Sequence, residues 1–122
     1  MLFRSYFYGG NYTGVDMQGA DLAYAQMQGS IFAQANLNDT NLYDADMTSM
    51  NLFSVSLVDA NLTAANLANS HANFADMTSA TFTSADLSGV YLNGATLTGA
   101  TFAGVNWTGT TCPNGWVTDT GC

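Results

Sequence analysis

Apolar side chains recur at every fifth residue along almost the whole chain. The series starts at Leu2 and ends at Trp107, and Ala72 is its only small member. The residue two positions before each apolar residue is nearly always small. From residue 5 onward, 11 of these 21 positions are Ala, and only Met50 is large. A period of five fits neither the 3.6-residue repeat of a helix nor the simple alternation of a long strand.

The pattern predicts a short extended step followed by a turn, repeated along the chain. Within each step the apolar residue and the small residue two before it share one face and point inward, while their neighbours point outward. Gly recurs two residues after the apolar position, where the backbone must change direction. An amphipathic helix with a coincidental pattern is the alternative, but no helix keeps every fifth residue on one face over such a length. The sequence therefore predicts an all-β solenoid with a continuous core.

Repeated Ala-Asp-Leu and Ala-Asn-Leu units carry a family resemblance. The clearest units are Ala20-Asp21-Leu22, Ala35-Asn36-Leu37, Ala60-Asn61-Leu62, Ala65-Asn66-Leu67 and Ala85-Asp86-Leu87. They closely resemble the repeats of pentapeptide-repeat proteins over roughly residues 5–109. The resemblance implies a right-handed quadrilateral β-helix with four pentapeptides per coil, and hence about five and a half coils. The sequence supports four pentapeptides per coil only weakly, through the similarity of core residues that are 20 apart. The clearest such column is Leu22, Leu42 and Leu62, followed by Phe82 and Phe102. We expect residues 1–109 to form this solenoid.

The charge of the chain narrows the possible partners. It has nine Asp, no Glu, no Lys and one Arg (Arg4), with a formal net charge of −8. This balance disfavours direct binding to nucleic acid and to anionic membranes, but it permits a partner with a basic groove. No stretch approaches the roughly 20 apolar residues of a membrane span, and the N-terminus has no secretory signal. Membrane insertion is therefore not expected.

Catalytic chemistry has few candidates. The single histidine, His71, is interpreted as a solvated surface residue, because no cysteine and no second histidine can join it in a metal site. No nucleophile triad, phosphate-binding loop or zinc cluster can be assembled from the sequence. We predict that the chain is not an enzyme and that it uses no cofactor or metal.

One face of the coil is predicted to carry an apolar stripe. The four outward residues that replace the usual Asn, Asp or Thr are Ile31, Phe53, Phe74 and Tyr91. We interpret the stripe as an interaction surface, against the alternative of scattered surface hydrophobic residues. Phe74 has two possible positions, since it could turn inward beside the small Ala72 or stay on the surface.

The next face is predicted to be acidic. It carries Asp16, Asp39, Asp59 and Asp76, and Asp39 and Asp59 should stack one coil apart. Two such charges in water repel by only about 1 kcal/mol, so a solvated face is the simplest interpretation. A weakly held cation is one alternative. The family resemblance implies another, because some pentapeptide-repeat proteins resemble duplex DNA and bind type II topoisomerases.

The repeat stops after Trp107, and residues 110–122 are predicted to form a cap. Its two cysteines, Cys112 and Cys122, can form one bridge across a turn at Pro113, which would stabilise the fold by roughly 2–3 kcal/mol. We expect the bridge to hold Trp116 over the open end of the core. A stable disulfide implies an oxidising compartment, while two free thiols in a cytosolic protein are the alternative. The tail also resembles the ends of exported bacterial pentapeptide-repeat proteins. We therefore predict an extracellular or periplasmic location.

The N-terminal end has no comparable cap. It is crowded with aromatic residues, namely Phe3, Tyr6, Phe7, Tyr8 and Tyr12. An open solenoid end exposes unpaired backbone groups, so a missing segment or another subunit should cover it. We therefore predict a structural or interaction module that binds a protein partner or itself, as a dimer or filament. The alternative function is a DNA-mimicking inhibitor of a type II topoisomerase.

Overall fold

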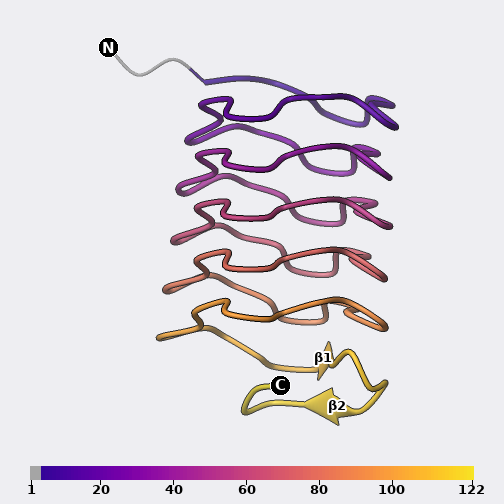
Figure 1. The fold of residues 1–122 in the computed structure, drawn as a ribbon, viewed down its shortest axis with the longest axis vertical. Coiled ribbons are helices and arrows are strands. Elements are labelled where there is room, and N and C mark those ends of the chain that lie inside the picture. The colour runs from indigo at the N-terminus through magenta and orange to yellow at the C-terminus, as the bar shows by residue number, and fades with distance from the viewer. Residues whose placement is uncertain (1–3) are drawn as a thin grey trace.

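The chain winds into a stack of four-sided coils along one axis (Figure 1). This computed structural model describes residues 4–122, so the predictions for Leu2 and Phe3 lie outside the described residues. The fold is all-β, a right-handed quadrilateral β-helix, which confirms the predicted fold class. Within the described part of the chain, no helix is long and apolar enough to cross a membrane.

Successive coils are joined by a backbone ladder with a period of 20 residues. Isolated parallel bridges all join residues 20 apart, from Tyr6–Gln26 to Tyr91–Thr111. The N–H of Leu22 donates to the carbonyl of Asn41 at 2.7 Å, and the N–H of Asn41 donates back to the carbonyl of Ala20 at 3.0 Å. Each pentapeptide therefore stacks on the one four repeats later, as the family resemblance implied.

The 20-residue period divides the inward apolar residues into four columns, one for each face of the coil. Face A contains Tyr12, Phe32, Leu52, Ala72 and Leu92; face B contains Met17, Leu37, Leu57, Met77 and Leu97; face C contains Leu22, Leu42, Leu62, Phe82 and Phe102; face D contains Phe7, Met27, Met47, Leu67, Leu87 and Trp107.

A turn separates each face from the next. The N–H of Ala25 donates to the carbonyl of Leu22 at 3.0 Å, and the same bond recurs along the solenoid. The second turn residue always has a positive φ, which Gly adopts without steric cost. Gly fills this position near both ends, but twelve other residues fill it in between, including Tyr24 and Phe74. The sequence rule of Gly at this position therefore holds only towards the two ends of the rod.

The core is continuous and follows the five-residue pattern. Apolar residues and the small residues two before them are buried through the middle coils, and Leu37 and Leu57 are completely inaccessible. Where the small residue is Ser or Thr, its hydroxyl is bonded inside, as in the bond from Ser70 Oγ to the carbonyl of Met47 at 2.7 Å. Ala72 is buried, and Phe74 lies outside, so the alternative in which Phe74 turns inward is wrong.

Aromatic rings lie over the core at the N-terminal end. Tyr12 packs on Phe7, with 5.2 Å between ring centroids, and on Phe32, with 4.9 Å. Its ring lies across Gly10, where a Cβ atom would collide with a ring carbon. Tyr12 is therefore partly buried and packs against the hydrophobic core.

At the C-terminal end the chain turns back on itself. Strand β1 (Thr110–Thr111) pairs antiparallel with strand β2 (Val117–Thr118), and a disulfide joins Cys112 to Cys122. The ladder of the solenoid continues into β1, because the N–H of Leu92 donates to the carbonyl of Thr111.

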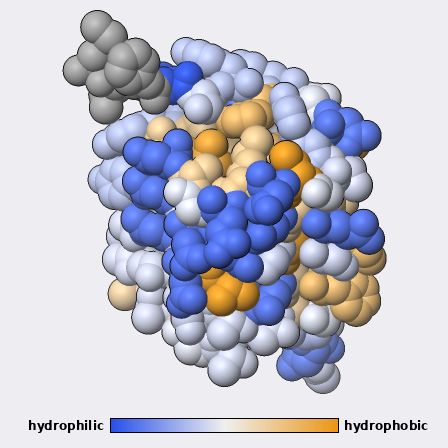
Figure 2. Space-filling model, turned by 45° about the horizontal axis from the view of Figure 1, so that its top comes forward, coloured by the Kyte–Doolittle hydropathy of each residue, from blue (hydrophilic) through white to orange (hydrophobic). Residues whose placement is uncertain are grey.

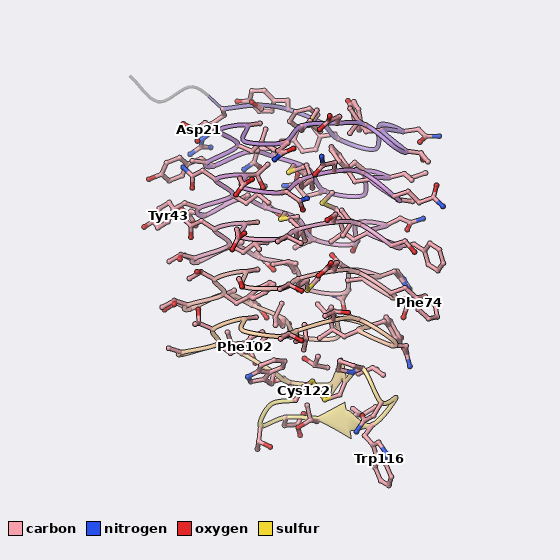
Figure 3. The ribbon with its side chains drawn as sticks, viewed as in Figure 1. Asp21, Tyr43, Phe74, Phe102, Trp116 and Cys122 are labelled. Carbon is pink, nitrogen blue, oxygen red and sulfur yellow. A yellow bond between two sulfur atoms is a disulfide. The ribbon has the colours of Figure 1, made fainter. Side chains whose placement is uncertain are left out.

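Trp116 does not cover the core. It is 75% exposed and projects away from the rod (Figure 3). Trp107 closes the core instead, with its ring 4.9 Å from that of Phe102. The expectation for Trp116 was wrong because the inward position of the next repeat is taken by Cys112, and the hairpin then carries Trp116 to the outer side of the turn.

Candidate interaction surfaces

Exposed aromatic side chains gather on face A and on the turn that follows it. Phe53, Phe74 and Tyr91 are 42%, 60% and 45% exposed. The ring centroids of Phe53 and Phe74 are 5.6 Å apart at an edge-to-face angle. The rings of His71 and Tyr91 are stacked at 4.9 Å and 7°. We call Phe53, Phe74, His71 and Tyr91 the aromatic strip.

The position of Phe74 depends on the residue one coil later. Phe74 occupies the turn position with a positive φ, so its side chain points away from the core. Its ring lies over Gly94, where a Cβ atom would come within 2.6 Å of two ring carbons. Gly94 therefore provides the space in which the ring packs along the outside of the rod, at the edge seen in Figure 3.

The structure changes the composition of the predicted stripe. Ile31 is only partly exposed, and the ladder places Asn51 and His71 between Ile31 and Tyr91. Ile31 is thus separated from Tyr91 by two coils. His71 was interpreted as a solvated surface residue and is exposed, and its ring also stacks on that of Tyr91. Its position 20 residues before Tyr91 was the sequence signal for this contact.

The N-terminal aromatic residues divide into two groups. Tyr6 and Tyr8 are exposed, and their rings stack 6.0 Å apart. Tyr12 lies on the core, while Phe3 is outside the described residues. Figure 2, in which this end is turned towards the viewer, shows apolar surface lying among hydrophilic side chains.

The carboxylates of the predicted acidic face take part in turns. Asp16 and Asp76 lie on the outward ladder of face B. Oδ1 of Asp16 accepts the N–H of Gln18 at 3.1 Å, and Oδ1 of Asp76 accepts the N–H of Thr78 at 3.0 Å. Such bonds from an Asp to the backbone two residues on are ordinary turn chemistry.

Asp39 and Asp59 occupy the turn after face B on successive coils, both with a positive φ. Oδ2 of Asp39 accepts the side-chain amide of Gln18 at 3.1 Å. Within residues 4–122, no three His, Cys, Asp or Glu residues lie close enough to hold a metal ion. The weakly held cation therefore remains a prediction.

Among the hollows on the surface of residues 4–122, two are considered as possible sites. The larger, of about 670 Å³, lies between face B of the last coil and the C-terminal hairpin, where Leu97, Val117 and the disulfide contribute to its lining. The smaller, of about 280 Å³, lies at the turn between faces C and D beside Tyr24 and Asp44. Neither contains an arrangement of catalytic groups.

The sequence of this chain matches a model of one protein family, and its structure matches solved structures of proteins described in the same way. A family model described as pentapeptide repeats matches in eight copies, over residues 2–39, 20–58, 30–67 and 56–99. A search of curated proteins found no match.

Many solved structures are similar to this chain, including the following two. A pentapeptide repeat protein from the cyanobacterium Cyanothece 51142 has 23% identity and a TM-score of 0.69, with 80% of this chain and 83% of that chain covered. A pentapeptide repeat protein from Nostoc Pcc 7120 has 37% identity and a TM-score of 0.61, with 62% of this chain and 63% of that chain covered. The first comparison supports the fold alone, and the second covers less than two thirds of either chain.

Proposed function

Because the chain belongs to the pentapeptide-repeat family, we propose that it is a non-catalytic module that binds a protein partner, or a second copy of itself, through exposed aromatic side chains. The observation that carries this proposal is the aromatic strip, in which three large rings are each more than 40% exposed on one side of the rod. Burying a Phe side chain contributes about 1.5–3 kcal/mol, so covering two or three of them would stabilise a complex. The exposed pair Tyr6 and Tyr8 offers a second contact at the N-terminal end.

An exported location fits this function. Cys112 and Cys122 are bonded, and the described residues contain no free cysteine. Disulfides persist in oxidising compartments and are rare in the cytosol. The bond therefore supports the proposal that the protein works outside the cytoplasm.

A second candidate function, inhibition of a type II topoisomerase by DNA mimicry, rests on Asp39 and Asp59. They occupy the same turn position on successive coils and so form a vertical pair of carboxylates. This candidate has less support, because Asp16 and Asp76 are hydrogen-bonded within their own turns. A supercoiling assay with gyrase tests it. Inhibition that is lost in Asp39→Asn/Asp59→Asn would favour it, and no inhibition at micromolar protein would exclude it.

Sedimentation velocity over a range of protein concentrations tests the self-association part of the first proposal. We expect the average mass to rise with concentration, and the rise to disappear in Phe53→Ser/Phe74→Ser or in Tyr6→Ser/Tyr8→Ser. Tyr43→Ser is the matched control, because Tyr43 is also exposed but lies on the turn after face C. A mass that stays monomeric at every concentration would exclude self-association and leave only a different protein as partner.

A further inference from the structure

The C-terminal hairpin leaves the strand positions beneath faces B and C of the last coil empty, and the position beneath face B adjoins the hairpin. After face A the 20-residue period would place residues 115–119 beneath residues 95–99 of face B. The chain instead turns back at Pro113–Gly115, and β2 pairs with β1 under face A. The underside of face B in the last coil therefore has no following coil.

The backbone groups at this position are unpaired. One coil earlier, the N–H of Met77 donates to the carbonyl of Thr96 and the N–H of Ser79 to the carbonyl of Thr98, both at 2.8 Å. The equivalent donors in the last coil are the N–H groups of Leu97 and Gly99, and neither has an acceptor among the described residues. The carbonyl of Ala95 likewise has no donor, although its equivalent at Ala75 accepts the N–H of Thr96.

The larger hollow lies at the same place. Its volume of about 670 Å³ is enough for several side chains. Leu97 and Ala95 line it on the solenoid side, and Trp116, Val117 and the disulfide line it on the hairpin side. An apolar floor beside free backbone donors and acceptors is the arrangement to which an extended peptide adds as a strand.

A second solenoid cannot fill this position. The hairpin runs below face A through the β1–β2 pair and then crosses below Trp107 of face D, where Gly121 approaches the indole. The carboxylate of Asp119 accepts the N–H of Gly109 at 2.7 Å and fixes this crossing. A flat coil would collide with the hairpin, whereas a single extended segment can enter beneath face B.

We propose that the hollow binds an extended segment of a partner protein, which pairs in parallel with residues 95–99. The second residue of the five-residue segment donates its N–H to the carbonyl of Ala95, and its carbonyl accepts the N–H of Leu97. The carbonyl two residues later accepts the N–H of Gly99. The solenoid pattern then requires a small residue beneath Ala95 and a large apolar residue beneath Leu97. This site is separate from the aromatic strip and does not depend on it.

The test uses the full chain and a blocked peptide with the neutral sequence of Ala60–Ala64, Ala-Asn-Leu-Thr-Ala. Amide resonances and hydrogen exchange of the ¹⁵N-labelled protein are followed as the peptide is added. We expect exchange at Leu97 and Gly99 to slow by about fivefold or more at saturation. A peptide with Asp in place of its Leu, and one with an N-methyl group on its Asn, should not bind.

Two variants separate this site from the proposed interaction surface. Val117→Asp places a charge in the lining of the hollow and should weaken peptide binding by about tenfold, and because Val117 is exposed the fold should be unaffected. Phe74→Ser should bind the peptide as the wild-type chain does. No change at Leu97 and Gly99, or binding that is lost in Phe74→Ser, would overturn the proposal. The proposal would also be overturned if the amides of Leu97 and Gly99 were protected from exchange without peptide and the protein had twice its monomer mass. That result would show that a second copy fills the hollow.

Discussion

Met50 and Ala72 lie in the core of neighbouring coils on face A and reverse the usual sizes of their positions. Met50 is the only large residue at a position where small residues are the rule, and Ala72 is the only small residue in the apolar series. Both are completely buried, and the bridge between Asn51 and His71 stacks their two repeats, so the added volume of Met50 lies one coil from the volume missing at Ala72.

This relationship predicts coupled effects on stability. Met50→Ala should lower the free energy of unfolding by about 2–5 kcal/mol, because it leaves a cavity. Ala72→Leu alone should cost about 1–3 kcal/mol through overpacking, and it should cost less when residue 50 is Ala. Urea unfolding of the four proteins in this cycle measures the coupling. Val55→Ala on face B is the control, and its effect should add to that of Ala72→Leu without coupling.

Gly94→Ala should destabilise the protein more than Gly104→Ala does. Both residues have a positive φ, at 68° and 70°, so the backbone strain is similar. A Cβ atom at Gly94 would lie 2.6 Å from the ring of Phe74, whereas one at Gly104 would lie 3.5 Å from Ser84 Oγ. The extra loss, of about 1 kcal/mol, should disappear in the Phe74→Ser background. Equal losses in the two Gly variants would mean that the ring moves aside freely.

Reduction of the disulfide should lower stability at the C-terminal end. The chain-entropy estimate for so short a loop is about 2–3 kcal/mol. Thermal unfolding with and without a reducing agent measures this loss, and Cys112→Ser/Cys122→Ser is the matched variant that should no longer respond to the reductant. An unchanged melting temperature in both experiments would show that the β1–β2 pairing, the Asp119–Gly109 hydrogen bond and the packing on Trp107 hold the hairpin without the disulfide.

Asn41→Asp should disrupt a ladder of side chains along face C. The amide of Asn41 donates to Asp21 Oδ1 at 3.0 Å, and the amide of Asn61 donates to Asn41 Oδ1 at 3.2 Å. The substitution removes one donor and places two carboxylates together, which should cost about 1–2 kcal/mol. Asn51→Asp is the control, because the side chain of Asn51 bonds only to the N–H of Phe53 in its own turn, and Asp can make the same bond. Chemical denaturation of both variants at neutral pH makes the comparison.

The sequence was enough to predict the fold because the period of five decides which side chains are buried. Leu37 and Leu57 are completely inaccessible for that reason. The contact between His71 and Tyr91 was not predicted, although the same 20-residue coil was used to stack Asp39 on Asp59, because His71 was considered only as a solvated residue and a possible metal ligand. The coil places His71 and Tyr91 one above the other.

The end of the chain was harder to predict. After Trp107 the periodic pattern is lost, so the expectation that Trp116 covers the core had no inward pattern behind it once the chain turned at Pro113. The direction of the Trp116 side chain depends on the pairing of β1 with β2. This pairing makes the chain fold back on itself, where it could have continued around the coil. The unoccupied strand position beneath Leu97 is a consequence of this fold-back, so the sequence did not predict it either.

The constant spacing of 20 residues in the backbone ladder also limits how the length of this protein can change in evolution. Loss or gain of a whole coil leaves every remaining column in register and only shortens or lengthens the rod. Loss of a single pentapeptide preserves the inward pattern but moves everything beyond it by a quarter turn. If the lost pentapeptide lay between them, Phe53 and Phe74 would stand on different corners, and the hairpin would close beneath a different pair of faces relative to the first coils.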